Sequence, residues 1–150
     1  MRKKHSFTLV GIMIVVAIIG LLVTIAFPAY DEARKRSQVN RFAKDIKVAT
    51  AAFEMYAIEN RGFPPDTTPS VMPNGMADYL DGMDWTGATT LGGKWDWDNG
   101  QFGFTAGVSV YQPDCEIELL ERVDQIIDDG SLSSGRFRSR TAGYIYVMEQ

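Results

Sequence analysis

The chain has 150 residues, 45% of them hydrophobic, and its 15 Lys and Arg against 19 Asp and Glu give a formal net charge of −4. This length allows one compact domain with a modest core, and the acidic balance argues against nucleic acid as the main partner. Cys115 is the only cysteine and His5 the only histidine. We therefore expect no intramolecular disulfide, no imidazole-dependent catalysis and no cofactor.

A long apolar run opens the chain. Between Lys4 and Asp31 there is no Asp, Glu, Lys or Arg, and His5 is the only basic side chain. Residues 7–27 would reach about 32 Å as a helix at 1.5 Å per residue, enough to cross a bilayer core of about 30 Å. A secretory signal has a shorter apolar stretch, about 7–15 residues, followed by a polar mature chain. The run therefore predicts a membrane-crossing helix.

The sequence from Ser6 to Tyr30 is SFTLVGIMIVVAIIGLLVTIAFPAY. With the basic leader MRKKHS, this segment closely resembles the N-terminus of type IV pilins and type II secretion pseudopilins. The resemblance implies cleavage by a prepilin peptidase between Ser6 and Phe7, N-methylation of the new Phe7 amine, and a cytoplasmic N-terminus.

Two positions depart from the family pattern. Ser6 stands where glycine usually precedes the cut, and Gly11 stands where the family usually has a glutamate that neutralises the terminal amine of a neighbouring subunit. Gly11 has two interpretations: a small residue that lets another helix approach closely, or a specialised place at a filament tip. Pro28 removes one backbone donor and permits a bend. We assign Gly11 and Pro28 to filament assembly.

Beyond Asp31 the pattern becomes that of an amphipathic helix ending near Asn60, where Arg61-Gly62 supplies a stop. The apolar stripe, which needs a sheet to cover it, comprises Val39, Phe42, Ile46, Ala49, Phe53 and Tyr56. The basic residues beside or opposite it are Arg34, Lys35, Arg36, Arg41, Lys44 and Lys47. For these cations we favour a solvated or headgroup-contacting face over DNA binding. The helix exit MYAIENRGFPPDT also resembles that of major pseudopilins.

Residues 64–93 read as a long connecting loop, with a short helix over residues 77–83. Next, Asn99-Gly100 lies between two alternating runs and predicts a two-residue hairpin. The resulting register pairs Asp98 with Gln101, Trp97 with Phe102, and Trp95 with Phe104. The aromatic face, joined by Ala106, Val108 and Val110, should cover the helix stripe.

Asp96 and Asp98 alternate with these tryptophans. A calcium loop is disfavoured because the glycine of DWDNG is misplaced for an EF-hand. Paired aspartates for glycoside hydrolysis would project from the solvent side of the strand, without an implied groove. For the tryptophans we favour core packing over sugar or peptide binding.

Asp114 is the expected cap of a second helix, which ends near Gly130. It should bury the side chains Ile117, Leu120, Val123 and Ile127, with an ion pair between Glu118 and Arg122. Asp124, Asp128 and Asp129 invite a cation hypothesis, since major pseudopilins often hold calcium in a C-terminal loop. The spacing does not reproduce that loop, so a solvated acidic helix end without metal is preferred. SLSSGRFRSRT reads as a loop or edge with exposed arginines, and GYIYVME as a final strand.

The predicted fold is α+β: a long N-terminal helix packed on a small antiparallel β-sheet. The expected organisation is a leader (residues 1–6), a transmembrane or filament-core segment (residues 7–30) and a periplasmic pilin-like domain (residues 31–150). The resemblance implies a structural subunit of a secretion pseudopilus or type IV pilus-like filament in the bacterial inner membrane, without enzymatic activity. Its partners would be other pilin subunits, the prepilin peptidase, the assembly platform and ATPase, and the lipid bilayer. The alternative is a minor pilin-like module that binds secreted cargo, polysaccharide or DNA.

Overall fold

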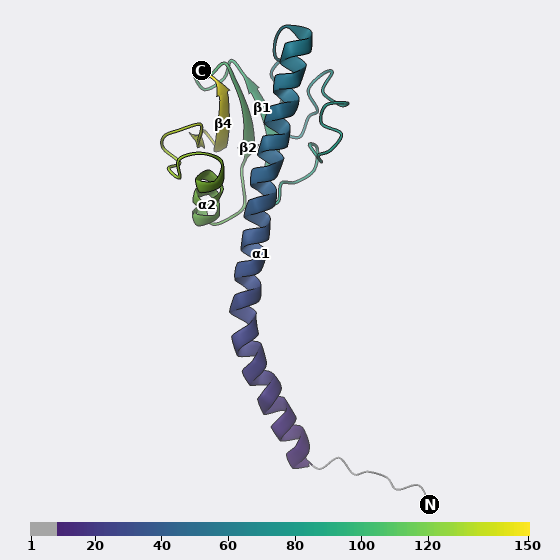
Figure 1. The fold of residues 1–150 in the computed structure, drawn as a ribbon, viewed down its shortest axis with the longest axis vertical. Coiled ribbons are helices and arrows are strands. Elements are labelled where there is room, and N and C mark those ends of the chain that lie inside the picture. The colour runs from purple at the N-terminus through teal and green to yellow at the C-terminus, as the bar shows by residue number, and fades with distance from the viewer. Residues whose placement is uncertain (1–8) are drawn as a thin grey trace, which may run out of the picture. The chain divides into compact units, whose positions relative to one another are not determined.

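The computed structural model describes residues 9–150, which form two helices and four strands (Figure 1). In chain order these are α1 (Leu9–Asn60), β1 (Lys94–Asn99), β2 (Ala106–Tyr111), α2 (Ile117–Ile127), β3 (Phe137–Arg140) and β4 (Gly143–Glu149). The chain divides into two units, residues 1–36 and residues 37–150, and α1 contributes to both. A long, apolar N-terminal helix and a small antiparallel sheet confirm the predicted α+β, pilin-like fold.

In the first unit, the described residues are all helical. From Leu9 to Phe27 the large apolar side chains are exposed on every side of the helix. By length and composition this part of α1 could cross a membrane. Thr24 donates its hydroxyl to the carbonyl of Gly20 at 2.8 Å, so the polar group is satisfied within the helix itself.

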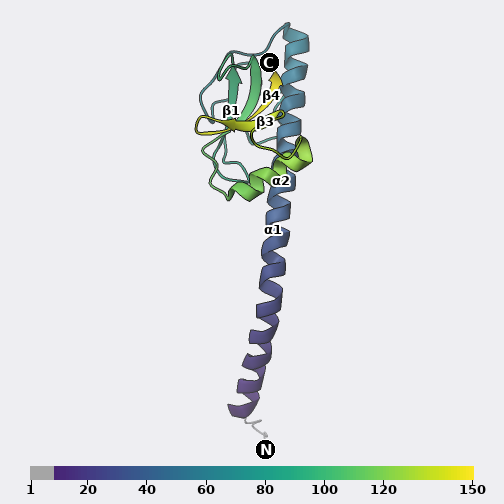
Figure 2. The ribbon, with the colours of Figure 1, turned by 90° about the vertical axis from the view of Figure 1, so that its left-hand side faces the viewer.

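In the second unit, the sheet is antiparallel throughout, with the strand order β1-β2-β4-β3 (Figure 2). β2 and β4 are therefore the central strands, and β1 and β3 form the edges. Residues 37–60 of α1 lie against one face of this sheet, beside β1 and β2 in Figure 1.

The second half of α1 buries the predicted stripe against β1 and β2. Phe42 stacks on Trp95 with ring centroids 5.0 Å apart, and Phe53 stacks on Trp97 at 3.8 Å. The buried positions of α1 are Val39, Phe42, Ala43, Ile46, Ala49, Ala52 and Phe53, and Tyr56 is partly buried. Side chains three and four residues apart share one face of a helix, so a single stripe supplies this half of the core.

α1 ends where the sequence predicts. Arg61 has a φ of 61°, and the Gly62 amide donates to the carbonyl of Ala57 at 3.0 Å, which closes the last turn. The loop that follows supplies four more core residues, Met76, Leu80, Trp85 and Leu91. The expected short helix over residues 77–83 is wrong: that stretch forms consecutive turns that press Met76 and Leu80 inward.

This loop also runs along the outer edge of β1. The amides of Thr67 and Ser70 donate to the carbonyls of Trp97 and Trp95, at 3.4 and 2.8 Å. The indole Nε1 of Trp97 donates to the carbonyl of Pro64 at 2.9 Å. The loop is therefore fixed to the sheet through β1.

The β1–β2 hairpin has a different register from the prediction. Asn99 pairs with Ala106, Trp97 with Val108, and Trp95 with Val110, so residues 100–105 form the connection instead of a two-residue turn. Phe102 and Phe104 lie in this connection and outside both strands. The shared face of the tryptophans with Ala106, Val108 and Val110 is nevertheless as predicted, because the register shift is an even number of residues.

Two details of α2 differ from the prediction. Glu116, not Asp114, occupies the N-cap position, and it makes no side-chain capping bond. Ile117 is 59% exposed, whereas Leu119, Leu120 and Val123 are buried. The ion pair of Glu118 and Arg122 is present, with 2.7 Å between Oε1 and Nη2.

Candidate functional site

The residues assigned to processing, Ser6 and Phe7, lie outside the described residues. Gly11 lies near the start of α1 and is partly exposed, and Pro28 is exposed within the same helix. Pro28 has no N–H to donate to the carbonyl of Thr24, four residues earlier. The structure therefore places both assembly candidates on a helix segment whose large apolar side chains are exposed.

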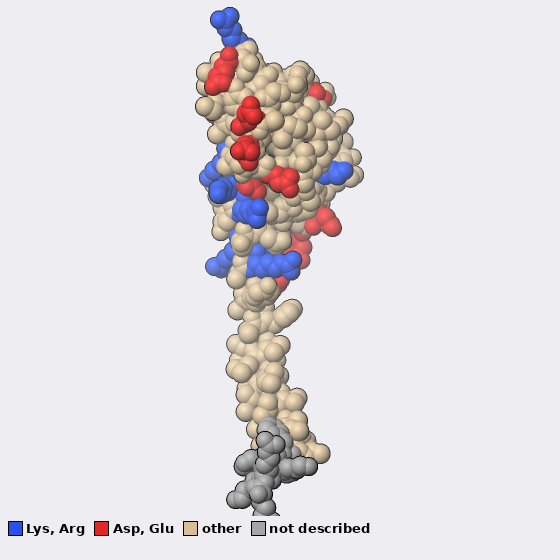
Figure 3. Space-filling model, turned by 90° about the vertical axis from the view of Figure 1, so that its right-hand side faces the viewer, with Lys and Arg blue, Asp and Glu red and all other residues tan. Residues whose placement is uncertain are grey.

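Basic side chains follow the apolar segment on α1. In the first unit, Lys35 pairs with Asp31 at 3.6 Å and Arg36 with Glu32 at 3.1 Å. In the second unit, Arg41, Lys44 and Lys47 are exposed, as a solvated face predicts. In Figure 3 the face shown of the narrow helix segment of the first unit is tan, without blue or red side chains.

A cluster of charged groups lies on the face of the sheet opposite α1. Nη2 of Arg140 lies 2.7 Å from Oδ2 of Asp96, and Nε lies 3.4 Å from Oδ2 of Asp98. Ser109 donates its hydroxyl to Asp98. The Arg140 side chain is only 4% exposed, and both aspartates are buried. The expectations of solvent-facing aspartates and an exposed arginine are therefore wrong at these positions.

Aromatic rings cover this cluster. The guanidinium of Arg140 lies over the ring of Phe102 at 4.8 Å and over that of Tyr111 at 5.8 Å, and Arg138 lies over Phe104 at 5.0 Å. Cation–π contacts of this kind are stronger when water is excluded. The hairpin connection thus folds over the arginines of β3, which explains why Phe102 and Phe104 leave the strands.

Burial changes the acidity of both aspartates. Burial, with the neighbouring charge of Asp98, raises the pKa of Asp96 to about 6, and Arg140 offsets part of that rise. Burial also raises the pKa of Asp98. A pair of carboxylates that hydrolyses a glycoside must face substrate, whereas these two face an arginine under aromatic rings. The cluster is suited to holding β1, β2 and β3 together.

A second group of carboxylates lies at the end of α2. Asp124, Asp128 and Asp129 each place one oxygen within 4.8 Å of the others. Asp124 is fully buried, in contrast to the solvated helix end that the sequence favoured. Burial, followed by the charges of Asp128 and Asp129, raises the pKa of Asp124 to about 6.

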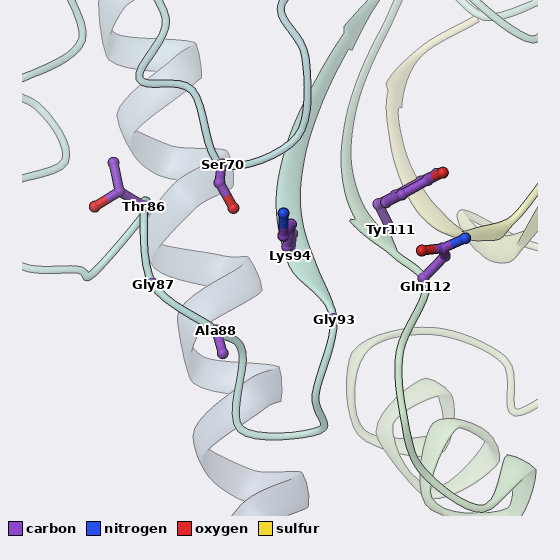
Figure 4. A pocket seen from close by; sticks show the side chains of 8 residues that line it. All are labelled: Ser70, Thr86, Gly87, Ala88, Gly93, Lys94, Tyr111 and Gln112. Carbon is purple, nitrogen blue, oxygen red and sulfur yellow. The ribbon is translucent and has the colours of Figure 1, made fainter.

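A hollow of about 280 Å³ lies between the long loop and the ends of β1 and β2 (Figure 4). Its lining residues are Ser70, Thr86, Gly87, Ala88, Gly93, Lys94, Tyr111 and Gln112. The lining includes the hydroxyls of Ser70 and Thr86 and the amine of Lys94. Among the hydrogen bonds of residues 9–150, none joins Lys94 to either hydroxyl, so the hollow shows no pairing of a nucleophile with a base.

Sequence reasoning missed the buried charge cluster and the burial of Asp124. The alternation Trp-Asp-Trp-Asp indicates that the aspartates lie on the face opposite the tryptophans. Their burial depends on Arg140, which lies more than 40 residues further along the chain, and no local pattern links the two.

Comparisons with known proteins find similarity at the N-terminal part of the chain, which includes the apolar segment of α1. Residues 1–27 match the family model described as the prokaryotic N-terminal methylation motif. A fimbrial protein of Pseudomonas aeruginosa is 38% identical over 69 residues, which cover 46% of this chain and 45% of the relative. The type II secretion system core protein G of the same species is 35% identical over 63 residues, 42% of this chain and 44% of the relative. A probable minor fimbrial protein of Dichelobacter nodosus is 56% identical over 41 residues, 27% and 26% of the two chains.

These matches span less than half of each relative, and no solved structure gives a significant match. The methylation motif and the named relatives confirm the predicted resemblance to the type IV pilins and pseudopilins. The relatives include pilus subunits and one secretion-system subunit. They support resemblance to filament subunits in general, and they do not distinguish a pilus from a secretion pseudopilus.

Proposed function

We propose that this chain is a structural subunit of a type II secretion pseudopilus or of a type IV pilus-like filament. The observation that carries the proposal is an apolar helix segment, residues 9–27, exposed on all sides in a chain that bears the N-terminal methylation motif. Exposed apolar area of this extent is unfavourable in water. It needs either a bilayer or the same segments of other subunits around it.

One helix can serve in both environments. Before assembly, residues 7–30 would anchor the chain once across the bacterial inner membrane, with residues 31–150 in the periplasm. After assembly, the same residues would form the filament core with other pilin or pseudopilin subunits. The remaining partners are the prepilin peptidase, the inner-membrane assembly platform and its ATPase. No enzymatic activity of the chain is part of this proposal.

Processing would remove residues 1–6 and leave an N-methylated Phe7. Mass analysis of the N-terminus, on protein from native membranes, tests this step directly. We expect a chain that begins at methylated Phe7. A Ser6→Arg variant should remain unprocessed because a long charged side chain replaces a small one at the cut, whereas Ser6→Gly should be processed fully. A stable natural chain that keeps Met1 would contradict the proposal.

Variants at Gly11 can distinguish two explanations of its role in assembly, the missing carboxylate and the close approach of another helix. A Gly11→Glu variant restores a carboxylate that a neighbouring amine could neutralise, and Gly11→Ala adds one methyl group without charge. If the missing charge limits assembly, Gly11→Glu should increase filament yield and Gly11→Ala should not. If close helix approach is what Gly11 provides, both variants should lower the yield.

The alternative function, a minor pilin-like module that binds cargo, polysaccharide or DNA, receives less support. It relies on accessible aromatic side chains, and Trp85, Trp95 and Trp97 are all buried. The indoles of Trp85 and Trp97 donate to the backbone carbonyls of Val71 and Pro64 at 2.9 Å. These tryptophans therefore pack in the core and do not offer an exposed ring for a ligand.

A further inference from the structure

The second unit contains two Asn-Gly pairs, one in the long loop at residues 74–75 and one at the end of β1 at residues 99–100. We infer that Asn74 is a site of spontaneous deamidation, in which the backbone nitrogen of Gly75 is the nucleophile, and that the fold protects Asn99 from the same reaction. The inference is independent of the proposed filament function. It assigns a covalent modification to an exposed turn, with water as the only co-reactant.

The reaction requires no oxidant, metal or cofactor. The Gly75 nitrogen attacks the side-chain carbonyl carbon of Asn74, and the bond from that carbon to Nδ2 breaks. The proton lost from Gly75 ends on the departing ammonia, and a cyclic succinimide remains. Water then opens the ring at the side-chain carbonyl, which gives aspartate, or at the main-chain carbonyl, which gives isoaspartate. Glycine favours the attack because it has no Cβ to hinder its nitrogen.

The turn that carries Asn74 has its ends in the core and its tip in solvent. Pro73 and Met76 are buried, and the Met76 amide donates to the carbonyl of Pro73 at 3.1 Å. Between them Asn74 and Gly75 are exposed, and Gly75 has a φ of +79°. This is a β-turn with glycine at its third position, where a positive φ is required in several turn types. Water and hydroxide therefore reach both reacting groups.

The nucleophile and its target are both free of hydrogen bonds to the protein. In the part of the chain that the structure describes, the Gly75 amide donates to no acceptor, and the Asn74 side chain has no hydrogen-bond partner. A hydrogen bond would hold the proton on the amide nitrogen or direct the side chain away from it, and it would have to break before attack. In this turn no such bond has to break.

The second Asn-Gly pair has the same chemistry in a closed setting. The Gly100 amide donates to the carbonyl of Thr105 at 2.9 Å, and Nδ2 of Asn99 donates to the carbonyl of Pro64 at 2.8 Å. The Asn99 amide is also bonded, to Oδ1 of Asp66 at 3.0 Å. Attack at Asn99 therefore requires local opening of the β1–β2 connection.

Isoaspartate changes the turn more than aspartate does. It adds one methylene group to the main chain between the buried Pro73 and Met76, so their hydrogen bond cannot keep its geometry. A Cβ at Gly75 would already lie 3.0 Å from Cε2 of Tyr56, which leaves the turn little room to shift toward α1. We therefore expect the isoaspartate form to melt at a lower temperature than the Asn74→Asp variant, which has the same charge and a normal main chain.

Peptide mapping by mass spectrometry tests the inference on the full chain, aged in detergent at mildly alkaline pH. Ageing in heavy-oxygen water labels the conversions that precede digestion. In the folded chain we expect deamidation to be at least about tenfold faster at Asn74 than at Asn99, which corresponds to about 1.4 kcal/mol of local opening. In the chain unfolded by urea the two rates should be similar. Equal rates in the folded chain, or an intact Asn74 after ageing, would overturn the inference.

Two variants assign the product to this turn. Asn74→Gln keeps an amide but requires a larger, less favourable ring, so it should lack the acidic isoform that the aged natural chain shows on isoelectric focusing. Asn74 is exposed, and this change should leave folding intact. Asn60→Gln is the matched control, because Asn60 is an exposed asparagine followed by arginine, and it should keep the isoform. An acidic isoform that persists in Asn74→Gln would contradict the assignment.

Discussion

The two halves of α1 are both α-helical, but they differ in how their apolar side chains are arranged and covered. In residues 9–27 the apolar side chains cover every side of the helix, and they remain exposed. In residues 39–53 only one stripe is apolar, and the sheet of the second unit covers it. An all-round apolar surface cannot be satisfied by one sheet face, which leaves the first half dependent on a bilayer or on other chains.

The two units also treat charge differently. The apolar segment has no charged side chain from Leu9 to Tyr30. The second unit buries Asp96, Asp98 and Arg140, but it pairs them with one another. Charge is therefore absent from the segment that we propose to contact lipid or other helices, whereas Asp96, Asp98 and Arg140 are buried where opposite charges neutralise one another.

The largest effect should come from a charge in the middle of the first half. Ile18→Asp places a carboxylate near the centre of the apolar segment, at a cost of about 2.5–3.5 kcal/mol for membrane insertion. We expect loss of membrane integration and of filaments, measured by membrane fractionation and electron microscopy. Lys44→Asp, on the exposed face of the second half, is the control and should remain membrane-bound. Normal filaments from Ile18→Asp would refute the role of this segment.

The next effect should come from a cavity in the second half. Phe53→Ala removes the ring stacked on Trp97 and should destabilise the second unit by about 3–5 kcal/mol. Denaturant unfolding, followed by tryptophan fluorescence, measures this loss. Met55→Ala, at a residue that is 56% exposed, should change stability by less than about 0.5 kcal/mol. Similar losses in the two variants would argue against the packing described for α1.

Breaking the buried charge pair tests whether neutralisation is what permits charge in the second unit. Arg140→Met leaves Asp96 and Asp98 buried without their cation and should cost up to about 3–5 kcal/mol. Adding Asp96→Asn should recover part of this loss, because one uncompensated charge is removed. If the double variant is no more stable than Arg140→Met, packing against Phe102 and Tyr111 is the main role of Arg140.

The smallest effect is a pH dependence of stability. Because the pKa of Asp96 is raised to about 6, the folded chain holds a proton that the unfolded chain releases near pH 4. This group therefore favours folding most below about pH 4, and its contribution is lost as pH rises towards and beyond 6. Asp96→Asn should remove this part of the slope between pH 4 and 7, measured by thermal unfolding in EDTA. An unchanged slope would show that Asp96 titrates normally.

The fold could be predicted where local pattern and tertiary contact agree. The stripe from Val39 to Phe53 and the stop at Arg61-Gly62 rest on helix periodicity and a local turn, and both are confirmed. The tryptophan face of β1 follows from alternation alone. The apolar segment could be recognised because its composition is extreme.

The rest depended on residues distant in sequence. Asn99-Gly100 is a strong hairpin signal, yet Phe102 and Phe104 pack against Arg140 and Arg138 of β3 and lengthen the connection. The expected Asp114 cap fails because α2 begins at Ile117, three residues later. Asp124 lies between Val123 and Gln125 in the last turns of α2, and nothing in the local sequence indicates that its side chain is buried.

The loop along β1 has a consequence for the proposed assembly of many copies of this chain in one filament. Edge strands with open backbone groups readily pair with strands of other molecules and start aggregation. Thr67 and Ser70 already occupy two carbonyls on the outer edge of β1, and the opposite edge, β3, has only four residues. The second unit therefore leaves little open strand edge for sheet-to-sheet pairing, which suits the proposed packing of copies through the apolar helix.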